Sequence, residues 1–387
     1  MNILYLTFYF EPDLSAGSFR NSTLVKELAL VTSGKANIDV YTTFPNRYKT
    51  YKLTSESFEN KENLNIYRIK IPTHNSGFLD QIRSFITYYI EVKKRTKNVE
   101  YDLVFASSSR LFTAFLGFRI AKNKRIPLYV DVRDIFFDSI KDLFGSNPIK
   151  WIFLPFLKYI EARTFFYATH INLISPGFRD YFKQYKNSVF TFFTNGIDED
   201  FLNYNSVTHS EDRKKVILYA GNIGEGQGLH KFVPELAKKN ENLYDFIIVG
   251  DGAAKEKLNN RLKELNCNNV IIKDPVSRAS LMKEYENADF LLIHLNDYAA
   301  FKKVLPSKIF ELGAIDKPII AGVGGYAAEF IKENLSNVIL IEPCDYRDCI
   351  NKLQAYDYKN VKRLSFIQKF NRKKINEEMA LSISSYL

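Results

Sequence analysis

The sequence predicts an α/β protein made of two doubly wound domains, each with a parallel sheet covered by helices on both faces. Short apolar segments of strand length alternate with longer segments of helical periodicity along the chain. One polar, aperiodic segment, around 198–215, interrupts this alternation. The length of 387 residues suits two to three domains, and a hydrophobic content of 46% with 25% charged residues excludes disordered, collagen-like and small disulfide-rich proteins.

The first domain is expected to span 1–197. It opens with an apolar strand at 3–8, followed by a helix from Ser18 that ends near Gly34. The opening strand is no signal sequence, because it lacks a basic start and runs straight into Glu11-Pro12-Asp13. Further strands are expected at 38–41, 66–71, 103–106, 128–130 and 171–174, with helices between most of them.

The second domain is expected at 216–360, after a linker at 198–215. Its strands are expected at 216–220, 246–249, 270–272, 290–293, 318–320 and 338–341. The last segment, 361–387, is helical and amphipathic. We expect a cleft between the carboxyl ends of the strands of the two domains, where doubly wound sheets bind ligands.

The net charge of +10 lies entirely in the first half of the chain. Residues 1–190 contain 27 Lys and Arg against 17 Asp and Glu, whereas 191–387 contain 27 of each. Such an asymmetry indicates a negatively charged partner: nucleic acid, an anionic membrane surface or a phosphorylated substrate. The three cysteines, without a C-x-x-C pair, indicate a reduced cytosolic set, and no run of about 18 apolar residues could span a membrane.

A glycine-rich turn at 221–228 follows an apolar strand and precedes a helix. Glycines there let the backbone approach a ligand, and the helix start offers free N–H groups to a phosphate. The alternative is a flexible turn without a ligand. The glycine spacing does not match the dinucleotide fingerprint, and the turn lacks the lysine of a P-loop.

Two further segments at strand ends in the second domain could serve the same ligand. A second glycine turn, Gly250-Asp-Gly252, ends the next strand. Later, Ser307 is a plausible N-cap, and Lys308 and Glu311 share a helix face. Lys308 could neutralise a phosphate while Glu311 binds ribose hydroxyls, or the two could form a solvated ion pair.

In the first domain, Asp131, Arg133 and Asp134 follow a strand, where active groups of doubly wound sheets lie. The alternative is a structural Asp/Arg pair. The segment 78–97 is aromatic and basic, and a second aromatic segment, 151–159, lies in the same basic half of the chain. Each could lie at a membrane interface or be a core helix with a solvated end.

Several of these motifs, taken in order, resemble a known family. The motifs are AGNIGEGQGL at 220–229, VGDG at 249–252, YENAD at 285–289, LPSKIFEL at 305–312 and TNGID at 194–198. Over nearly its full length the chain is similar to the retaining glycosyltransferases of family 4 with the GT-B fold. The similarity is greatest to the branch that builds bacterial O-antigen and capsule, which includes N-acetylfucosamine transferases.

The resemblance implies a UDP-sugar donor bound by the second domain, an acceptor near Gly17 and Arg133-Asp134 in the first, and a last helix that crosses back to the first domain. It implies no metal. The catalytic residues it suggests are Arg133, Asp134 and Lys308. The donor-binding residues it suggests are Gly17, Gly221, Asn222, Gly224, Gln227, Gly228, Gly252, Val276, Leu281, Ser307, Lys308 and Glu311.

Three positions depart from the common family pattern. A second Glu, eight residues before the ribose-binding one, is replaced by Lys303, and Asn222 and Gln227 stand where many members have Arg and Lys on the diphosphate. Arg133 occupies the place often held by a histidine. With fewer cations in the turn, Lys308 and backbone N–H groups are left to stabilise the leaving diphosphate.

We therefore expect an enzyme that transfers an N-acetylated or 6-deoxy hexose from UDP to a lipid-linked (polyprenyl diphosphate) saccharide. It would act as a peripheral protein on the cytoplasmic face of an anionic bacterial membrane. The alternatives are a GT-B-like sugar-nucleotide epimerase and a non-catalytic UDP-sugar-binding protein at the membrane. Nucleic acid is not expected as a partner, because no nucleic-acid motif accompanies the basic residues.

Overall fold

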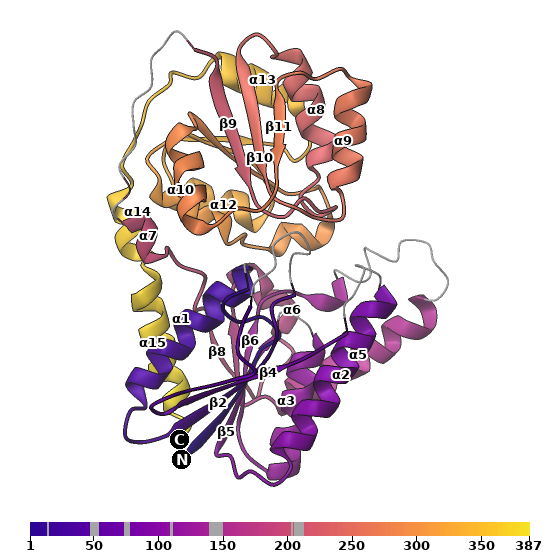
Figure 1. Ribbon diagram of the computed structural model, residues 1–387, viewed down its shortest axis with the longest axis vertical. Helices are drawn as coiled ribbons and strands as arrows, with labels where there is room; N and C mark the ends of the chain where they lie inside the picture. The colour runs from indigo at the N-terminus through magenta and orange to yellow at the C-terminus, as the bar shows by residue number, and fades with distance from the viewer. Residues whose placement is uncertain are drawn as a thin grey trace. The chain divides into compact units, whose positions relative to one another are not determined.

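The computed structural model describes residues 1–13, 15–46, 54–72, 78–108, 111–138, 150–202, 204 and 213–387. The chain divides into two compact units (Figure 1). Unit 1 comprises Met1–Asn195 and Arg372–Leu387, and unit 2 comprises Gly196–Asn371. The expected return of 361–387 to the first domain thus starts at 372 in the structure, because the helix before it packs within unit 2.

Unit 1 is built on a sheet of eight described strands in the order β3-β4-β2-β1-β5-β6-β7-β8, parallel except for the β3–β4 pair. The strand order reverses between β1 and β5, which are neighbours in the sheet. The strands are β1 (Asn2–Leu6), β2 (Asn37–Thr43), β3 (Phe58–Lys61), β4 (Leu64–Ile69), β5 (Leu103–Ser108), β6 (Leu128–Val132), β7 (His170–Leu173) and β8 (Val189–Thr191).

Helices cover both faces of this sheet (Figure 1). On one face α15 packs along α1 and contributes Met379, Ala380 and Ile383 to the core. On the other face α3 packs on β5 and lies between α2 and α5. The helices are α1 (Ala16–Val31), α2 (Phe78–Thr96), α3 (Leu111–Lys124), α5 (Lys150–Tyr167), the 3-10 turn η1 (Pro176–Phe178), α6 (Arg179–Phe182) and α15 (Arg372–Ser384).

Unit 2 is built on a parallel sheet in the order β11-β10-β9-β12-β13-β14. The chain moves outward from β9 and then returns to β12 beside it, so the loops after β9 and β12 diverge. Such a switch point is where open α/β sheets bind ligands. The strands are β9 (Lys215–Ala220), β10 (Tyr244–Val249), β11 (Val270–Lys273), β12 (Phe290–His294), β13 (Ile319–Gly322) and β14 (Val338–Ile341).

The helices of unit 2 form two layers. On one face α8 packs against α9 and α13 over the main core. A second group of helices, α11, α12 and α14, packs together through the aromatic side chains of Phe310, Phe330, Phe366 and Phe370. The helices are α7 (Glu199–Leu202), α8 (Leu229–Lys239), α9 (Lys255–Glu264), α10 (Arg278–Asn287), η2 (Ala299–Lys303), α11 (Lys308–Ala314), α12 (Tyr326–Asn334), α13 (Tyr346–Gln354) and α14 (Leu364–Lys369).

The predicted α/β fold with doubly wound parallel sheets is confirmed. The sequence analysis missed two strands: β3, which is polar and pairs antiparallel at one edge, and β8, which has only three residues at the other. The expected linker also differs, because its first residues form α7 and Phe201 is buried. Residues 203 and 205–212 of that segment lie outside the described residues.

No described helix is long and apolar enough to cross a membrane. The three cysteines, Cys267, Cys344 and Cys349, are free thiols. Among the residues that the structure describes, no group of three or more His, Cys, Asp or Glu side chains is arranged to hold a metal ion.

Candidate active site

Two glycine turns of unit 2 lie against each other at the carboxyl ends of β9 and β10. The Ile223 N–H donates to the Asp251 carbonyl at 2.9 Å. A Cβ at Gly250 would lie 1.9 Å from the Gly221 carbonyl oxygen, and one at Gly252 would lie 2.5 Å from that of Ile223. Gly252, predicted to bind the donor, therefore has a packing role in the structure, because only glycine lets the two turns approach this closely.

The turn after β9 contains two polar side chains that bond to each other. Asn222 Nδ2 donates to Gln227 Oε1 at 2.8 Å, and a Cβ at Gly224 would lie 2.5 Å from that Nδ2. Gly228, with φ of +63°, then starts α8. The turn thus presents two amides and the first N–H groups of a helix, which favour an anionic ligand.

His294, at the end of β12, forms a hydrogen bond to the backbone of this turn. Its Nδ1 lies 2.6 Å from the Gln227 carbonyl oxygen, while its Nε2 accepts from the Cys344 N–H at 2.9 Å. The proton must therefore be on Nδ1. The ring is buried and stacks on Phe232, and burial lowers the pKa of His294 to about 4, so the ring is neutral at pH 7. The sequence analysis missed His294, since no motif surrounds it.

Lys308 and Glu311 form an ion pair at the start of α11, together with Tyr285 from α10. Lys308 Nζ donates to Glu311 Oε2 at 2.7 Å and to the Tyr285 hydroxyl at 3.2 Å. Glu311 and Tyr285 are buried, so this is not the solvated pair considered as the alternative. Burial opposes the charge of Lys308, but Glu311 and Tyr285 outweigh it and raise its pKa above the ordinary value.

Ser307 does not act as the N-cap predicted for this helix. Its backbone is already helical, with φ of −59° and ψ of −29°, and its side chain makes no capping hydrogen bond. A capping side chain needs an extended backbone to turn back onto the first N–H groups. Ser307 instead leaves its half-buried side chain beside Lys308.

Arg278, from the first turn of α10, completes the cluster around Glu311. Its Nη1 lies 3.6 Å from Glu311 Oε1, and its Nη2 donates to Asp198 Oδ2 at 2.7 Å. Its guanidinium also lies 4.3 Å from the centre of the Phe201 ring. Asp198 and Phe201, from the segment expected to be a linker, thus belong to this cluster. The polar, aperiodic sequence of the segment gave no sign of these contacts.

Val276 and Leu281, both expected to bind the donor, lie on either side of the start of α10. Val276 is in the loop after β11, two residues before Arg278, and Leu281 is in the first turn of the helix. Both are half-buried. The element that carries Arg278 and Tyr285 therefore also carries these two apolar side chains.

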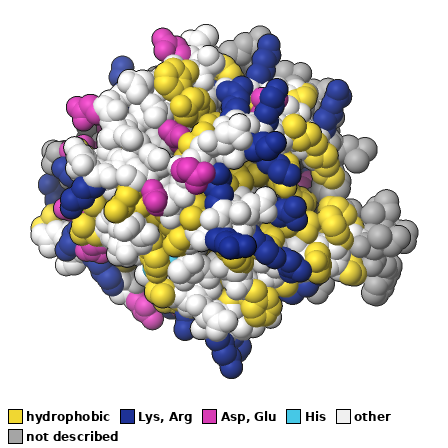
Figure 2. Space-filling model, turned by 90° about the horizontal axis from the view of Figure 1, so that it is seen from below, with side chains coloured by type: hydrophobic (Ala, Val, Ile, Leu, Met, Phe, Trp, Pro, Cys, Tyr) yellow, Lys and Arg dark blue, Asp and Glu magenta, His cyan; other side chains and the backbone are white. Residues whose placement is uncertain are grey.

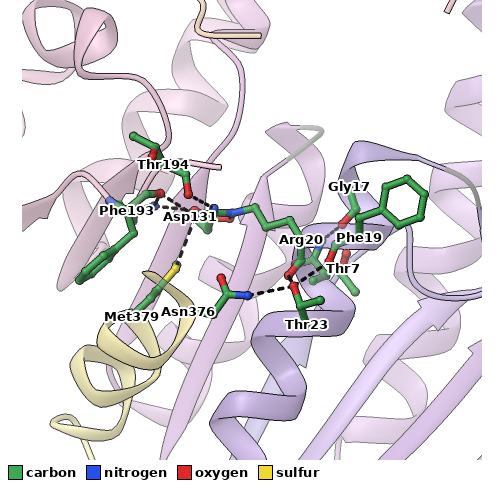
Figure 3. A network of polar contacts seen from close by, with 12 residues as sticks. Thr7, Gly17, Phe19, Arg20, Thr23, Asp131, Phe193, Thr194, Asn376 and Met379 are labelled. Carbon is green, nitrogen blue, oxygen red and sulfur yellow. Dashed lines mark hydrogen bonds and ion pairs between the residues drawn. The ribbon is translucent and has the colours of Figure 1, made fainter. Parts of the chain in front are cut away.

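In unit 1, Asp131 is paired with an arginine that the sequence analysis did not single out. Asp131 is fully buried and forms a two-point ion pair with Arg20 of α1, with two N···O distances of 2.9 Å (Figure 3). Arg20 also donates to the carbonyls of Phe193 and Thr194. Asp131 thus forms a structural Asp/Arg pair, the alternative considered for this segment, but its partner is Arg20 and not Arg133.

Arg133 and Gly17 lie in contact with each other. A Cβ at Gly17 would lie 3.0 Å from Arg133 Nη1. The Nε and Nη1 atoms of Arg133 are buried without an acceptor among the described residues. Burial and the charge of Arg20 lower the pKa of Arg133 to about 10. Asp134 is half-buried beside it in the chain, and these three predicted residues all belong to unit 1.

Comparisons with known proteins agree with this architecture. Residues 201–373 match the family model "Glycosyl transferases group 1". A stretch of 104 residues, 27% of this chain, is 32% identical to the "Putative colanic acid biosynthesis glycosyl transferase WcaI" of Escherichia coli strain K12. The chain matches about a quarter of that relative's length, 25%.

Solved structures match over nearly the full length. Sucrose-phosphate synthase from Thermosynechococcus elongatus has a TM-score of 0.72 at 13% identity, covering 99% of this chain and 98% of the other. Anabaena HepE in complex with UDP-glucose has a TM-score of 0.68 at 16% identity and covers 100% of both chains. The fold is thus the two-domain GT-B fold of these proteins. The family match extends over nearly all of unit 2.

Proposed function

We propose that this protein is a glycosyltransferase that moves a sugar from a UDP-sugar to a lipid-linked saccharide during the synthesis of a surface polysaccharide. The observation that carries the proposal is the cluster of half-buried Lys308 and Arg278 around buried Glu311 and Tyr285, which lies in a unit that matches the group 1 glycosyl transferases. The UDP-glucose bound to HepE and the colanic acid role given to WcaI support the donor and the pathway class.

The proposed donor site assigns a role to each part of unit 2. Glu311 accepts hydrogen bonds from the ribose hydroxyls, because its buried carboxylate has several acceptor positions. Lys308 and the N–H groups after Gly228 bind the diphosphate. The base lies against Val276 and Leu281. Ser307, Asn222 and Gln227 add neutral hydrogen bonds, while Gly221 and Gly224 leave room for the ligand.

The proposed chemistry is substitution at the anomeric carbon of the donor. A hydroxyl oxygen of the acceptor forms the new glycosidic bond as the bond to the UDP oxygen breaks. Negative charge develops on the leaving diphosphate, whose departing oxygen takes up the hydroxyl proton. Lys308, which is held protonated beside Glu311, offsets that charge without a metal. We also propose that the reaction retains the anomeric configuration and that the protein belongs to family 4, in its O-antigen and capsule branch.

The acceptor side of the proposal includes an anionic membrane surface. Exposed apolar side chains lie one or two helical turns apart on α2 (Ile86, Ile90) and on α5 (Phe156, Tyr159, Phe166). Exposed cations lie on the same helices and on α3 between them: Arg83, Lys93, Arg119, Lys122 and Arg163.

Acidic side chains are few on these three helices. Their carboxylates are Asp80 and Glu91 on α2 and the buried Glu161 on α5. Figure 2 shows one face of the molecule on which Lys and Arg side chains lie beside hydrophobic ones. Apolar side chains between cations favour the interface of an anionic bilayer. On α2, Phe85 and Tyr88 are core residues while Ile86 and Ile90 face outward, and the contact of this helix with a membrane stays a prediction.

The donor site is tested with a panel of nucleotide sugars. We expect UDP-sugars to raise the melting temperature of the wild-type protein, since a ligand of the folded state stabilises it. Glu311→Ala should weaken UDP binding, and Lys308→Ala should lower the turnover rate, whereas Asp245→Ala on the surface of the same unit should change neither. Wild-type affinity and rate in both site variants would overturn the assignment. Conversion of a UDP-sugar to its epimer without acceptor would instead indicate an epimerase.

The membrane surface is tested by flotation with vesicles of neutral phosphatidylcholine, with and without 30% phosphatidylglycerol. We expect binding only to the anionic vesicles, and weaker binding for Ile86→Glu and Phe156→Glu. Ile271→Glu is the matched control, because Ile271 is an equally exposed side chain of unit 2. Equal binding of all these variants, or no binding to anionic vesicles, would refute this part of the proposal.

A further inference from the structure

The cluster around Glu311 is built on two short helices of unit 2 whose positions must match. Arg278 and Tyr285 come from α10, which has 10 residues, and Lys308 and Glu311 come from α11, which has 7. Helices of this length are marginal by themselves, so contacts with the rest of the unit must fix them. The hydrogen bond from Lys308 to the Tyr285 hydroxyl forms only when the two helices are correctly placed.

Lys317, which lies outside this cluster, joins the carboxyl ends of the two helices. It is the third residue after α11. Its Nζ donates to the carbonyls of Tyr285 at 2.8 Å, of Glu286 at 2.6 Å and of Ala288. These carbonyls belong to the last turn of α10 and its C-cap. The last carbonyls of a helix lack an intrahelical partner and carry partial negative charge, so a buried ammonium group suits them.

The loop that carries Lys317 is itself fixed by a second buried cation, Arg363. The guanidinium of Arg363 donates to the Lys317 carbonyl at 3.0 Å and also to the Ile315 carbonyl. It reaches the loop before β13 as well, through the Asn337 carbonyl at 3.1 Å, which in turn accepts no other part of this loop. Lys317 thus contacts α10 from a loop that is held in place by several hydrogen bonds.

Tyr285 is bound at its backbone by one lysine and at its side chain by another. Its carbonyl accepts from Lys317, whereas its hydroxyl accepts from Lys308 at 3.2 Å and donates to Glu311 Oε2 at 3.5 Å. The residue is buried. A shift of the last turn of α10 would therefore move the hydroxyl away from Lys308 and Glu311.

We propose that Lys317 is a positioning residue of the donor site, which holds the end of α10 and so keeps Tyr285 in contact with Lys308 and Glu311. This inference rests on the proposed function, because that function assigns these residues to UDP binding. The side chain of Lys317 is buried, with 1% of the residue exposed, so it acts through Tyr285 and not on the substrate.

The charge of Lys317 can be removed at mildly alkaline pH. Burial lowers the pKa of Lys317 from 10.5 to about 8. The charged side chains around it are the carboxylates of Asp289, Asp316 and Glu286, which oppose this lowering, and the guanidinium of Arg213, which adds to it. Arg363 remains mostly charged at pH 9, because burial lowers its pKa only to about 10. The pKa of Lys308 is raised, so Lys308 keeps its proton while Lys317 loses its own between pH 7 and pH 9.

Loss of this proton should weaken donor binding while it stabilises the fold. A neutral amine has only two N–H donors and cannot serve three carbonyls, so the hold on the end of α10 weakens. The contribution of Lys317 to stability nonetheless rises with pH between 8 and 10.5, because the unfolded chain then binds more protons than the folded one. A purely structural lysine would not move donor affinity in the direction opposite to stability.

The experiment is calorimetry of UDP binding to the full chain at pH 7 and pH 9. Each variant is compared with the wild type at the same pH, which cancels the ionisation of the ligand. Lys317→Met should weaken binding about 3- to 10-fold at pH 7, as expected for coupling through one shared neighbour, and the difference from the wild type should shrink at pH 9. Lys317→Arg, which keeps a charge and several donors, should retain affinity and lose the pH dependence.

A matched control and a double-mutant cycle separate positioning from general damage. Lys352→Met removes another lysine of unit 2 that donates to a backbone carbonyl, that of Leu340 at 2.8 Å, and should leave UDP affinity unchanged. In a Tyr285→Phe background, Lys317→Met should weaken UDP binding less than it does in the wild type, because the hydroxyl is already absent. Without ligand, peptides covering 278–289 should exchange hydrogen faster in Lys317→Met than in Lys352→Met.

The outcomes distinguish this inference from the proposed function. Equal UDP affinity in wild type and Lys317→Met at pH 7 would overturn the positioning role, and so would equal pH dependence in wild type and Lys317→Arg. The second comparison decides the matter if Lys317→Met does not fold. UDP binding with the expected variant effects but without sugar transfer would count against the proposed function alone.

Discussion

A histidine locked in its neutral form makes the stability of unit 2 dependent on pH. His294 connects the glycine turn to the loop after β14 through Gln227 and Cys344. Protonation would put a second N–H on Nε2, which now accepts a hydrogen bond from the Cys344 N–H, and would bury a charge beside Phe232. We predict that His294 destabilises the turn in acid and that His294→Gln removes this pH dependence.

The magnitude follows from the pKa of His294, about 4 in the folded protein against an ordinary 6.5. Between these values the unfolded chain binds more protons, so stability is fully present above pH 6.5 and is lost as the pH falls toward 4. Linkage gives a loss of about 2.5 kcal/mol between pH 7.5 and pH 4.5 from this one group. His170 of unit 1, whose pKa burial also lowers to about 4, should behave in the same way within its own unit.

The assay is urea unfolding at pH 7.5 and pH 4.5, followed by hydrogen exchange of peptides from each unit. Peptides from α8 and β12 should lose about 2.5 kcal/mol more in the wild type than in His294→Gln. Peptides from β7 in unit 1 should show the same pH dependence in both proteins, since His170 is unchanged. The reasoning is refuted if unit 2 loses equal stability in acid with and without the imidazole.

Three further substitutions test contacts inside unit 1 and inside unit 2. Gly250→Ala should lower the unfolding free energy of unit 2 in urea by more than about 2 kcal/mol, because its Cβ would lie 1.9 Å from the Gly221 carbonyl oxygen. The control Gly324→Ala, whose Cβ would have no atom closer than 3.6 Å, should be tolerated. Equal losses in the two variants would contradict this reasoning. Asp131→Asn should destabilise unit 1 by about 3–5 kcal/mol, because it leaves the buried charge of Arg20 without its carboxylate. Asp180→Asn at the surface should leave the stability unchanged. A stable Asp131 variant would count against the buried pair. Arg278→Gln should weaken UDP binding about tenfold in calorimetry, because Glu311 loses the guanidinium that lies beside its carboxylate. Arg347→Gln is the control and should leave the affinity unchanged. Unchanged affinity in Arg278→Gln would remove Arg278 from the site.

Local sequence patterns were sufficient for most of the fold. Buried parallel strands such as β1 and β12 are continuous apolar runs, and their alternation with helices indicates the sheet type. Edge strands do not show this pattern, because β3 is exposed and polar and β8 is short. Residues 198–202 were predicted to begin a linker because their acidic side chains resemble those of a solvated loop. In the structure, Asp198 and Asp200 pair with Arg278, which is distant in sequence.

The candidate site was predictable where it consists of consecutive residues. Lys308 and Glu311 are three residues apart on one helix, and the glycine turn is a single segment. Long-range partners were not predictable: Arg20 meets Asp131 across 111 positions, and His294 meets the turn across 67. Such pairs depend on the order of strands in the sheet, which a local pattern does not contain.

The central claim is that this chain transfers a sugar from a UDP-sugar to a lipid-linked saccharide. The most direct measurement is to incubate the full chain with radiolabelled UDP-sugars and polyprenyl-diphosphate saccharides and to count the label in the extracted lipid. The account predicts label in the lipid together with an equal amount of released UDP, and loss of both in Glu311→Ala. Tight binding of UDP-sugars with no label in any lipid acceptor and no UDP release would contradict it and would favour a non-catalytic binding protein.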